Sequence, residues 1–170
     1  MRFELLNAAH IDEVFRLWSD FDTVKFTNWN HTPDLAACSD RMAKVISFYS
    51  SDPHHFGPYV IWLGDGSFGG MIGADLVDRS MGEYDIWYII LRDYWHRGIA
   101  MEAVGQLLRQ MRATNRAKRV TASVVVENTR SGKLLERSGF VRDSISPGAF
   151  QKHGATLDLY RYSLPLHATE

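Results

Sequence analysis

The chain has 170 residues, of which 45% are hydrophobic and 23% charged, and its net charge is −1. This length favours a single domain over residues 1–170, and the near-neutral charge argues against a nucleic-acid-binding protein, which usually carries a basic surface. The N-terminus lacks the pattern of a signal peptide and no apolar run reaches the ~20 residues that span a membrane, so we expect a cytoplasmic protein without a membrane partner.

The first part of the chain is predicted to form one strand and two helices. Arg2–Leu6 is a short predicted strand, and Asn7 offers a side-chain cap for an amphipathic helix that extends to Trp18. An aromatic-rich loop is expected over 20–32. A second amphipathic helix is predicted to begin at Thr32-Pro33, because proline suits the first position of a helix.

The remaining elements are predicted from runs of β-branched and aromatic residues between turns, and from apolar residues at helical spacing. Three strands, a helix, a strand, a helix and two strands are expected: Tyr59–Leu63, Phe68–Val77, Gly82–Leu91, Met101–Thr114, Arg119–Val126, Thr129–Arg137, Val141–Ile145 and Leu157–Leu164. This order predicts a mixed α/β domain whose first half is largely antiparallel.

A segment after the third of these strands is a candidate phosphate site. It reads YWHRGIAMEA over residues 94–103 and opens a predicted helix. The first backbone N–H groups of a helix lack intrahelical partners and favour an anion, Gly98 permits close backbone approach, and Arg97 can add a charged contact. An ordinary turn with a surface arginine is the alternative. The Walker and dinucleotide-binding patterns are absent.

The same segment resembles the acetyl-CoA-binding signature of GNAT acetyltransferases, Q/R-x-x-G-x-G/A. It is most similar to the branch that acts on ribosomal-protein N-termini (RimJ/RimL-like), where Y-W-G-R-G-Y-A-T-E-A is typical. Gly98 and Ala100 match the two small positions. Trp95 stands where the broad motif has glutamine or arginine, and His96 stands where the branch has glycine. If that position requires a positive φ, His96 strains the loop.

A second segment, ENTRSGKLLERSGF over residues 127–140, resembles the family's E-N-x-x-S-x-x-L-L-E-K-x-G-F. Its alternative reading is a plain helix that Asn128 caps and Gly139 ends. Both segments occur in the family's order, each after a strand, and the resemblance covers nearly the whole chain. It implies the GNAT fold: a mixed central sheet of about seven strands flanked by about four helices. Two splayed parallel strands then form the acetyl-CoA cleft.

The resemblance also implies which residues bind acetyl-CoA. The backbone of the strand and the second motif would hold the pantetheine arm, and the loop amides would hold the pyrophosphate. The strand residues are Ile89, Ile90 and Leu91; the second-motif residues are Asn128 and Ser131; the loop residues are Arg97, Gly98, Ile99, Ala100, Met101 and Glu102.

Catalysis in this family is direct transfer to an amine, which must be neutral to attack. Glu83 and Asp85 lie two residues apart on one face of a strand, and either could be the base. Asp85 aligns with the acidic residue of the family's E-I-G-Y-W. The alternative is that both are surface carboxylates. Leu135 stands where many members have a tyrosine acid, so Ser131 is the nearest candidate acid, or else a helix-capping hydroxyl.

We therefore expect an acetyl-CoA-dependent N-acetyltransferase. The branch resemblance favours a protein or peptide N-terminus as the acceptor amine, and a small amine or an antibiotic is the alternative within the same chemistry. A non-catalytic acyl-CoA-binding regulatory module is the alternative from another class. No metal is expected, because no residue set has ligand spacing. No nucleic-acid partner is expected, and the protein would be a monomer or a homodimer.

Overall fold

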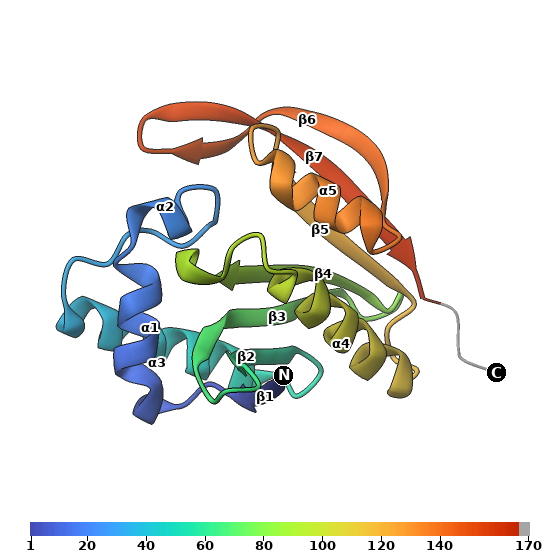
Figure 1. The fold of residues 1–170 in the computed structure, drawn as a ribbon. Coiled ribbons are helices and arrows are strands. Elements are labelled where there is room, and N and C mark those ends of the chain that lie inside the picture. Colours follow the sequence, from blue (N-terminus) through green and yellow to red (C-terminus); the bar gives the residue numbers. More distant parts are fainter. Residues whose placement is uncertain (167–170) are drawn as a thin grey trace. The chain divides into compact units, whose positions relative to one another are not determined.

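The computed structural model describes residues 1–166, which form seven strands and five α-helices with two short 3-10 turns (Figure 1). In chain order the elements are β1 (Arg2–Leu5), η1 (Ala8–His10), α1 (Ile11–Trp18), α2 (Phe21–Val24), α3 (Leu35–Ser51), β2 (Phe56–Trp62), β3 (Phe68–Asp78), β4 (Glu83–Ile90), η2 (Arg92–Tyr94), α4 (Ile99–Ala113), β5 (Arg119–Val125), α5 (Thr129–Arg137), β6 (Val141–Lys152) and β7 (Ala155–Pro165).

The seven strands pair in the order β1-β2-β3-β4-β5-β7-β6. The pairs β1/β2, β2/β3, β5/β7 and β6/β7 are antiparallel, and β4/β5 is parallel. The chain divides into two compact units, one of residues 1–74 with 87–103 and one of residues 75–86 with the chain from Val104 onward. This mixed sheet with its helices confirms the predicted fold class.

The core of the first unit is built from the apolar stripes of its helices. Val14, Leu17 and Trp18 of α1 are fully buried, and Cys38 and Met42 of α3 are buried in the same cluster. Burying side chains of this size stabilises a fold by roughly 1.5–3 kcal/mol each. The single cysteine therefore serves as a small core residue.

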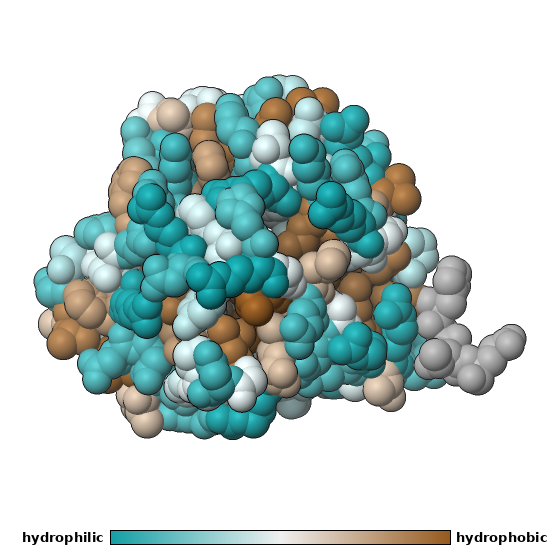
Figure 2. Space-filling view, viewed as in Figure 1, coloured by the Kyte–Doolittle hydropathy of each residue, from teal (hydrophilic) through white to brown (hydrophobic). Residues whose placement is uncertain are grey.

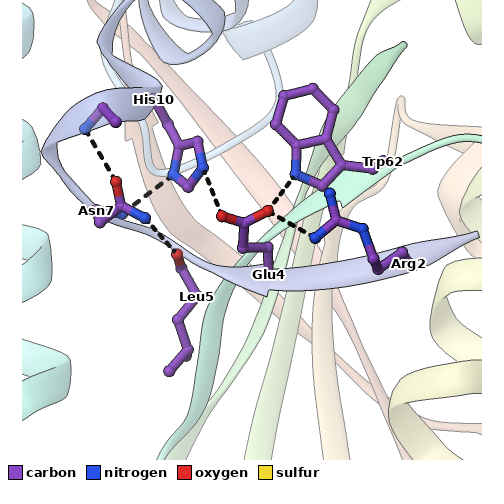
Figure 3. Close-up of polar contacts among 7 residues, drawn as sticks. Arg2, Glu4, Leu5, Asn7, His10 and Trp62 are labelled. Carbon is purple, nitrogen blue, oxygen red and sulfur yellow. Dashed lines mark hydrogen bonds and ion pairs between the residues drawn. The ribbon is translucent and has the colours of Figure 1, made fainter. Parts of the chain in front are cut away.

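A polar network fastens β1 to β2 and to the start of α1 (Figure 3). Glu4 accepts hydrogen bonds from Arg2 (2.7 Å) and the indole N–H of Trp62 (3.0 Å), and its other oxygen lies 3.3 Å from Nε2 of His10. The Arg2 hydrogen bond lowers the pKa of Glu4, and His10 and Trp62 lower it further. The Asn7 side chain accepts from the Ala9 N–H at 2.9 Å and so caps η1, the 3-10 turn directly before α1, whereas the cap was predicted for the helix itself.

In the second unit, α5 covers one face of the β5-β7-β6 strands (Figure 1). The Tyr162 hydroxyl of β7 lies 3.3 Å from the Glu136 carboxylate of α5, and Leu135 of α5 is fully buried. Neighbouring residues of a strand point to opposite faces. Arg161, next to Tyr162, therefore belongs to the face that α5 does not cover.

Some element boundaries differ from the sequence prediction. The helix expected from Thr32-Pro33 begins at Leu35, because the Asp34 side chain caps it by accepting from the Ala37 N–H at 2.8 Å. The expected loop contains the one-turn helix α2, which Asp20 caps. β2 begins three residues earlier than expected, at Phe56. The last two strands are longer, because β6 and β7 pair as far as Lys152 and Ala155.

The surface carries scattered hydrophobic residues among polar ones, as on the face shown in Figure 2. Exposed examples are Phe48 of α3, Met101 of α4 and Ile145 of β6. Single exposed apolar residues of this kind are ordinary in folded proteins. Within residues 1–166, no helix is long and apolar enough to cross a membrane.

Candidate functional site

The turn after β4 has the backbone shape of a ligand-binding loop. Leu91 leads into the 3-10 turn η2, and the chain then adopts positive φ at His96 (62°) and Gly98 (78°) before α4 begins at Ile99. Only glycine enters this left-handed region without steric cost. The predicted strain at His96 is therefore present.

The space around Gly98 is open. A β-carbon added there would meet no atom within 4 Å, so a ligand can approach the backbone. The Gly98 carbonyl accepts the Glu102 N–H at 3.0 Å, which is the first backbone bond of the α4 turn. The Glu102 amide is thus used inside the helix. The amides of Ile99, Ala100 and Met101 precede that bond and belong to the group that a helix leaves without intrahelical partners.

Side chains of the same loop hold its shape. The Arg97 guanidinium lies over the Tyr94 ring, 5.6 Å from its centroid. The indole N–H of Trp95 donates to the Ile90 carbonyl at 2.9 Å, which ties the loop back to β4. Trp95, which replaces the polar residue of the broad motif, therefore has a structural role here.

Two exposed ion pairs connect η2 to the first helices. Arg16 of α1 lies 2.5 Å from Asp93, and Arg92 lies 2.7 Å from Asp22 of α2. Exposed pairs of this kind contribute ~0–1 kcal/mol each. They nevertheless link the turn before the loop to α1 and to α2, the helix that the sequence did not predict.

At the end of β4, the backbone groups on the β3 edge are already hydrogen-bonded, so a ligand could pair only with the opposite edge. The Leu91 N–H donates to Gly69 of β3 at 3.0 Å, and the Leu91 carbonyl accepts the Tyr94 N–H at 3.0 Å. Successive residues of a strand direct their N–H and C=O groups to opposite edges. Ile89 therefore shares the β3 edge with Leu91, and Ile90 faces the opposite edge. The register of β4 with β5 covers only Glu83–Arg119 to Asp85–Thr121.

Asn128 and Ser131 lie at the start of α5 in the second unit. The Asn128 side chain caps the helix by accepting the Ser131 N–H at 3.4 Å, and its carbonyl accepts the same N–H at 3.0 Å. Ser131 is half-buried. Gly139 has φ +91° just after α5, which confirms that it ends the helix. The capped helix expected from the second motif is therefore present.

Glu83 and Asp85 share one face of β4 but have different partners. Glu83 lies 4.0 Å from Arg119 of β5, which also donates to Asp143 of β6 at 3.1 Å. Within residues 1–166, Asp85 forms no ion pair with an arginine, and it accepts from the Thr121 hydroxyl at 2.8 Å. Burial raises the pKa of Asp85, and the Asp75 and Glu83 charges raise it further, against the lowering effects of Thr121 and Arg161.

These residues line an open groove of about 480 Å³ in the second unit. Its wall also includes Ser144 of β6 and Arg161 of β7, which lie opposite each other in register. The sequence prediction did not include Arg119, Thr121 or Arg161. One signal was available, because polar residues alternate with buried ones along β5, from Val120 to Val124.

The described residues contain two chemical features that suit group transfer to an amine. The loop around Gly98 can hold an anion, and Asp85 is a carboxylate whose pKa is raised by burial, which makes it a stronger proton acceptor. Within residues 1–166, no three His, Cys, Asp or Glu side chains are placed to hold a metal ion.

Comparison with known proteins identifies the family. Residues 1–141 match the family model described as an acetyltransferase (GNAT) domain. An uncharacterized N-acetyltransferase, p20, from Bacillus licheniformis is 28% identical over 153 residues, which cover 90% of this chain and 85% of that protein.

Two solved structures share the fold. The RimL ribosomal L7/L12 α-N-protein acetyltransferase in complex with coenzyme A has a TM-score of 0.88 at 14% identity, covering 98% of this chain and 94% of that one. The spermidine N-acetyltransferase from Vibrio cholerae in complex with CoA and spermine has a TM-score of 0.84 at 14% identity, covering 97% and 95%. At these identities the likeness concerns the fold and does not identify the acceptor.

Proposed function

Because this chain belongs to the GNAT acetyltransferase family, we propose that it transfers an acetyl group from acetyl-CoA directly to a primary amine. Acetyl-CoA supplies an acetyl thioester, whose carbonyl carbon the amine attacks. The observation that carries this proposal is the open loop around Gly98, where a positive φ and free space meet the first turn of a helix. Such a turn favours the negative charge of a pyrophosphate.

In this proposal, the loop residues contact the pyrophosphate in different ways. Backbone amides of Gly98, Ile99, Ala100 and Met101 would receive the pyrophosphate. Arg97, whose guanidinium already lies over the Tyr94 ring, would add a positive charge. The Glu102 amide contributes less than the resemblance suggests, because it bonds to the Gly98 carbonyl.

The pantetheine arm would use the end of β4. Of Ile89, Ile90 and Leu91, Ile90 is the residue whose N–H faces away from β3, so it is our first choice for the hydrogen bond to the arm. Asn128 and Ser131 at the start of α5 remain candidates for the arm's other side, as the resemblance implies.

For the proton transfers we assign Asp85 as the base. Glu83 lies 4.0 Å from the Arg119 guanidinium, whereas burial raises the pKa of Asp85 and so strengthens Asp85 as a base. Asp85 would take the proton of the attacking ammonium directly or through water. Ser131 remains the candidate for protonating the departing thiolate. A thiol with a pKa near 8.5 also leaves without an acid, so this role is the weaker requirement.

The acceptor that we infer is a protein or peptide N-terminus, with a small amine as the second candidate. A free α-amino group has a pKa of ~7.7–8, so a carboxylate base suffices to deprotonate it, whereas a lysine at ~10.4 needs more help. The RimL and spermidine acetyltransferases that share the fold act on these two classes of amine, as their names state.

Gly98→Asp tests the cofactor site. The new carboxylate would occupy the open space and repel the pyrophosphate, so acetyl-CoA affinity should fall by about 100-fold or more, since like charges placed together cost several kcal/mol. Gly98→Asn is the matched control, because asparagine has the same size and tolerates a positive φ without the charge. Calorimetric titration with acetyl-CoA would measure both. Wild-type affinity in Gly98→Asp, with the fold intact, would contradict the assignment.

A further inference from the structure

The groove lies on the face of the second unit that α5 does not cover, and it contains two opposite charges that form no ion pair within residues 1–166. Arg119 lies between Glu83 and Asp143, so it offsets one of these two negative charges and the three groups together keep one negative charge. Arg161 donates to the Ser123 hydroxyl, and within residues 1–166 it forms no ion pair with a carboxylate. Among the described residues, the Asp85 carboxylate is hydrogen-bonded to the Thr121 hydroxyl and forms no ion pair. Besides that cluster, the groove therefore offers a ligand the Asp85 carboxylate and, on β7, the Arg161 guanidinium.

The strand register sets how far apart these two groups are. Asp85 of β4 lies opposite Thr121 of β5, and Ser123 of β5 lies opposite Arg161 of β7. The two charges therefore stand on strands two places apart, roughly 10 Å between backbones, with a stagger of two residues. Both side chains line the same groove, and the arginine is long enough to reach much of that distance.

Hydroxyl groups surround the positive end. Ser123 contacts Arg161, and Ser144 of β6 lies opposite Arg161 in register and lines the groove. A guanidinium with neighbouring hydroxyls suits a carboxylate or phosphate, which accepts several hydrogen bonds at once. A polycation would meet a repulsive charge at this end.

We propose that the acceptor amine carries an anionic group a few bonds away, and that Arg161 binds this group while the amine lies toward Asp85. The proposal rests on the acetyltransferase function proposed above and narrows its acceptor to a zwitterion, such as an amino acid, a short peptide with a free C-terminus or an aminoalkyl phosphate. Arg161 is then a specificity-determining residue rather than part of the chemistry.

Matched pairs of amines test this directly. Glycylglycine is compared with glycylglycine amide, phosphoethanolamine with ethanolamine, and spermidine is included as a polycation. Release of CoA thiol is measured for the wild type, for Arg161→Gln and for Arg109→Gln, which removes an exposed arginine of α4 outside the groove. The peptide pair tests whether the protein recognises a carboxylate, and the second pair tests whether it recognises a phosphate.

In at least one pair, the wild type should have a higher kcat/KM for the anionic member, by which we mean the amine that also carries a carboxylate or phosphate. Arg161→Gln should raise the KM of that member on the order of tenfold relative to its partner, because the anion contact is lost. Arg161 also lowers the pKa of Asp85, but that effect on the base is the same for both members and cancels in the comparison. Arg109→Gln should behave as the wild type. A merely structural role of Arg161 would change both members of the pair equally.

Three results would overturn the inference: preference of the wild type for the neutral amines or spermidine, equal effects of Arg161→Gln on both members, or no turnover of any anionic amine. Acetyl-CoA binding is measured on the same preparations. Binding without turnover of anionic amines rejects the zwitterionic acceptor and leaves the cofactor site intact. A folded protein that binds no acetyl-CoA would reject the acetyltransferase function itself.

Discussion

At the scale of single residues, His96 stands in a conformation that its side chain disfavours. Its φ of 62° lies in the left-handed region, which costs a non-glycine residue roughly 1–2 kcal/mol. His96→Gly should therefore raise the free energy of unfolding by about 1 kcal/mol, and His96→Val, with a branched β-carbon, should lower it. Urea unfolding of the three proteins measures both changes. A less stable His96→Gly protein would mean that the histidine side chain makes a compensating contact.

Asp85 gives a second prediction at this scale, through pH. Burial raises its pKa above the ordinary value of 3.8. The folded protein thus holds the proton more tightly than the unfolded chain, and the stability this provides is full below pH 3.8 and is lost as the pH rises through the folded-state pKa. Asp85→Asn cannot ionise.

The unfolding free energy of Asp85→Asn, minus that of the wild type, should therefore increase as the pH rises above 3.8 and then level off. Activity should fall by roughly 10²–10⁴-fold if Asp85 is the base. Denaturant titrations at a series of pH values measure the first quantity. A difference that stays flat with pH would show that Asp85 titrates normally, and it would then no longer be the preferred base over Glu83.

At the scale of elements, the residue that caps α5 has both a structural role and a proposed role in binding. Asn128 caps the helix through its oxygen, and its amide N–H₂ is the group that we propose for the pantetheine arm. Asn128→Ala should lose about 1 kcal/mol of stability, whereas Asn128→Asp should keep the cap, because aspartate caps as well as asparagine.

If the amide also binds the arm, both variants should lose affinity for acetyl-CoA, including the stable Asn128→Asp. Urea unfolding and calorimetric titration on the same preparations separate the two roles. Full acetyl-CoA affinity in Asn128→Asp would restrict Asn128 to capping α5.

Most elements could be predicted because their signals are local. The apolar stripes of α1 and α3 and the caps at Asn7 and Asn128 are readable in a few residues. The far end of β6 could not be predicted, because residues 146–152 read SPGAFQK, which contains a proline and a glycine and shows no alternation of apolar and polar side chains. It is a strand because β7 pairs with it, and the sequence does not indicate that partner. α2 is a single turn held mainly by Asp20.

The candidate site divides in the same way. The loop around Gly98 is contiguous in sequence, so its glycine and its strained histidine could be predicted together. The groove combines β4, β5, β6 and β7, and the register that brings Arg161 opposite Ser123 is fixed only by folding. Sequence reasoning therefore reached Glu83 and Asp85 but not the arginines that distinguish them.

At the scale of the whole molecule, acetyl-CoA should stabilise the fold, because it binds the folded chain and not the unfolded one. At about 100 times its Kd, the free energy of unfolding should rise by roughly 2.7 kcal/mol. Gly98→Asp should show almost none of this increase at the same concentration. Equal stabilisation of the two proteins would place the ligand elsewhere.

The most direct test of the account is product formation by the purified protein. The protein is incubated with acetyl-CoA and a panel of amines that includes peptides, zwitterions and polyamines, and free CoA thiol and acetylated amine are quantified together. We predict that at least one amine is acetylated in a one-to-one ratio with thiol release, and that Gly98→Asp abolishes both signals. A folded protein that binds acetyl-CoA yet acetylates no amine would contradict the account and favour a non-catalytic acyl-CoA-binding module.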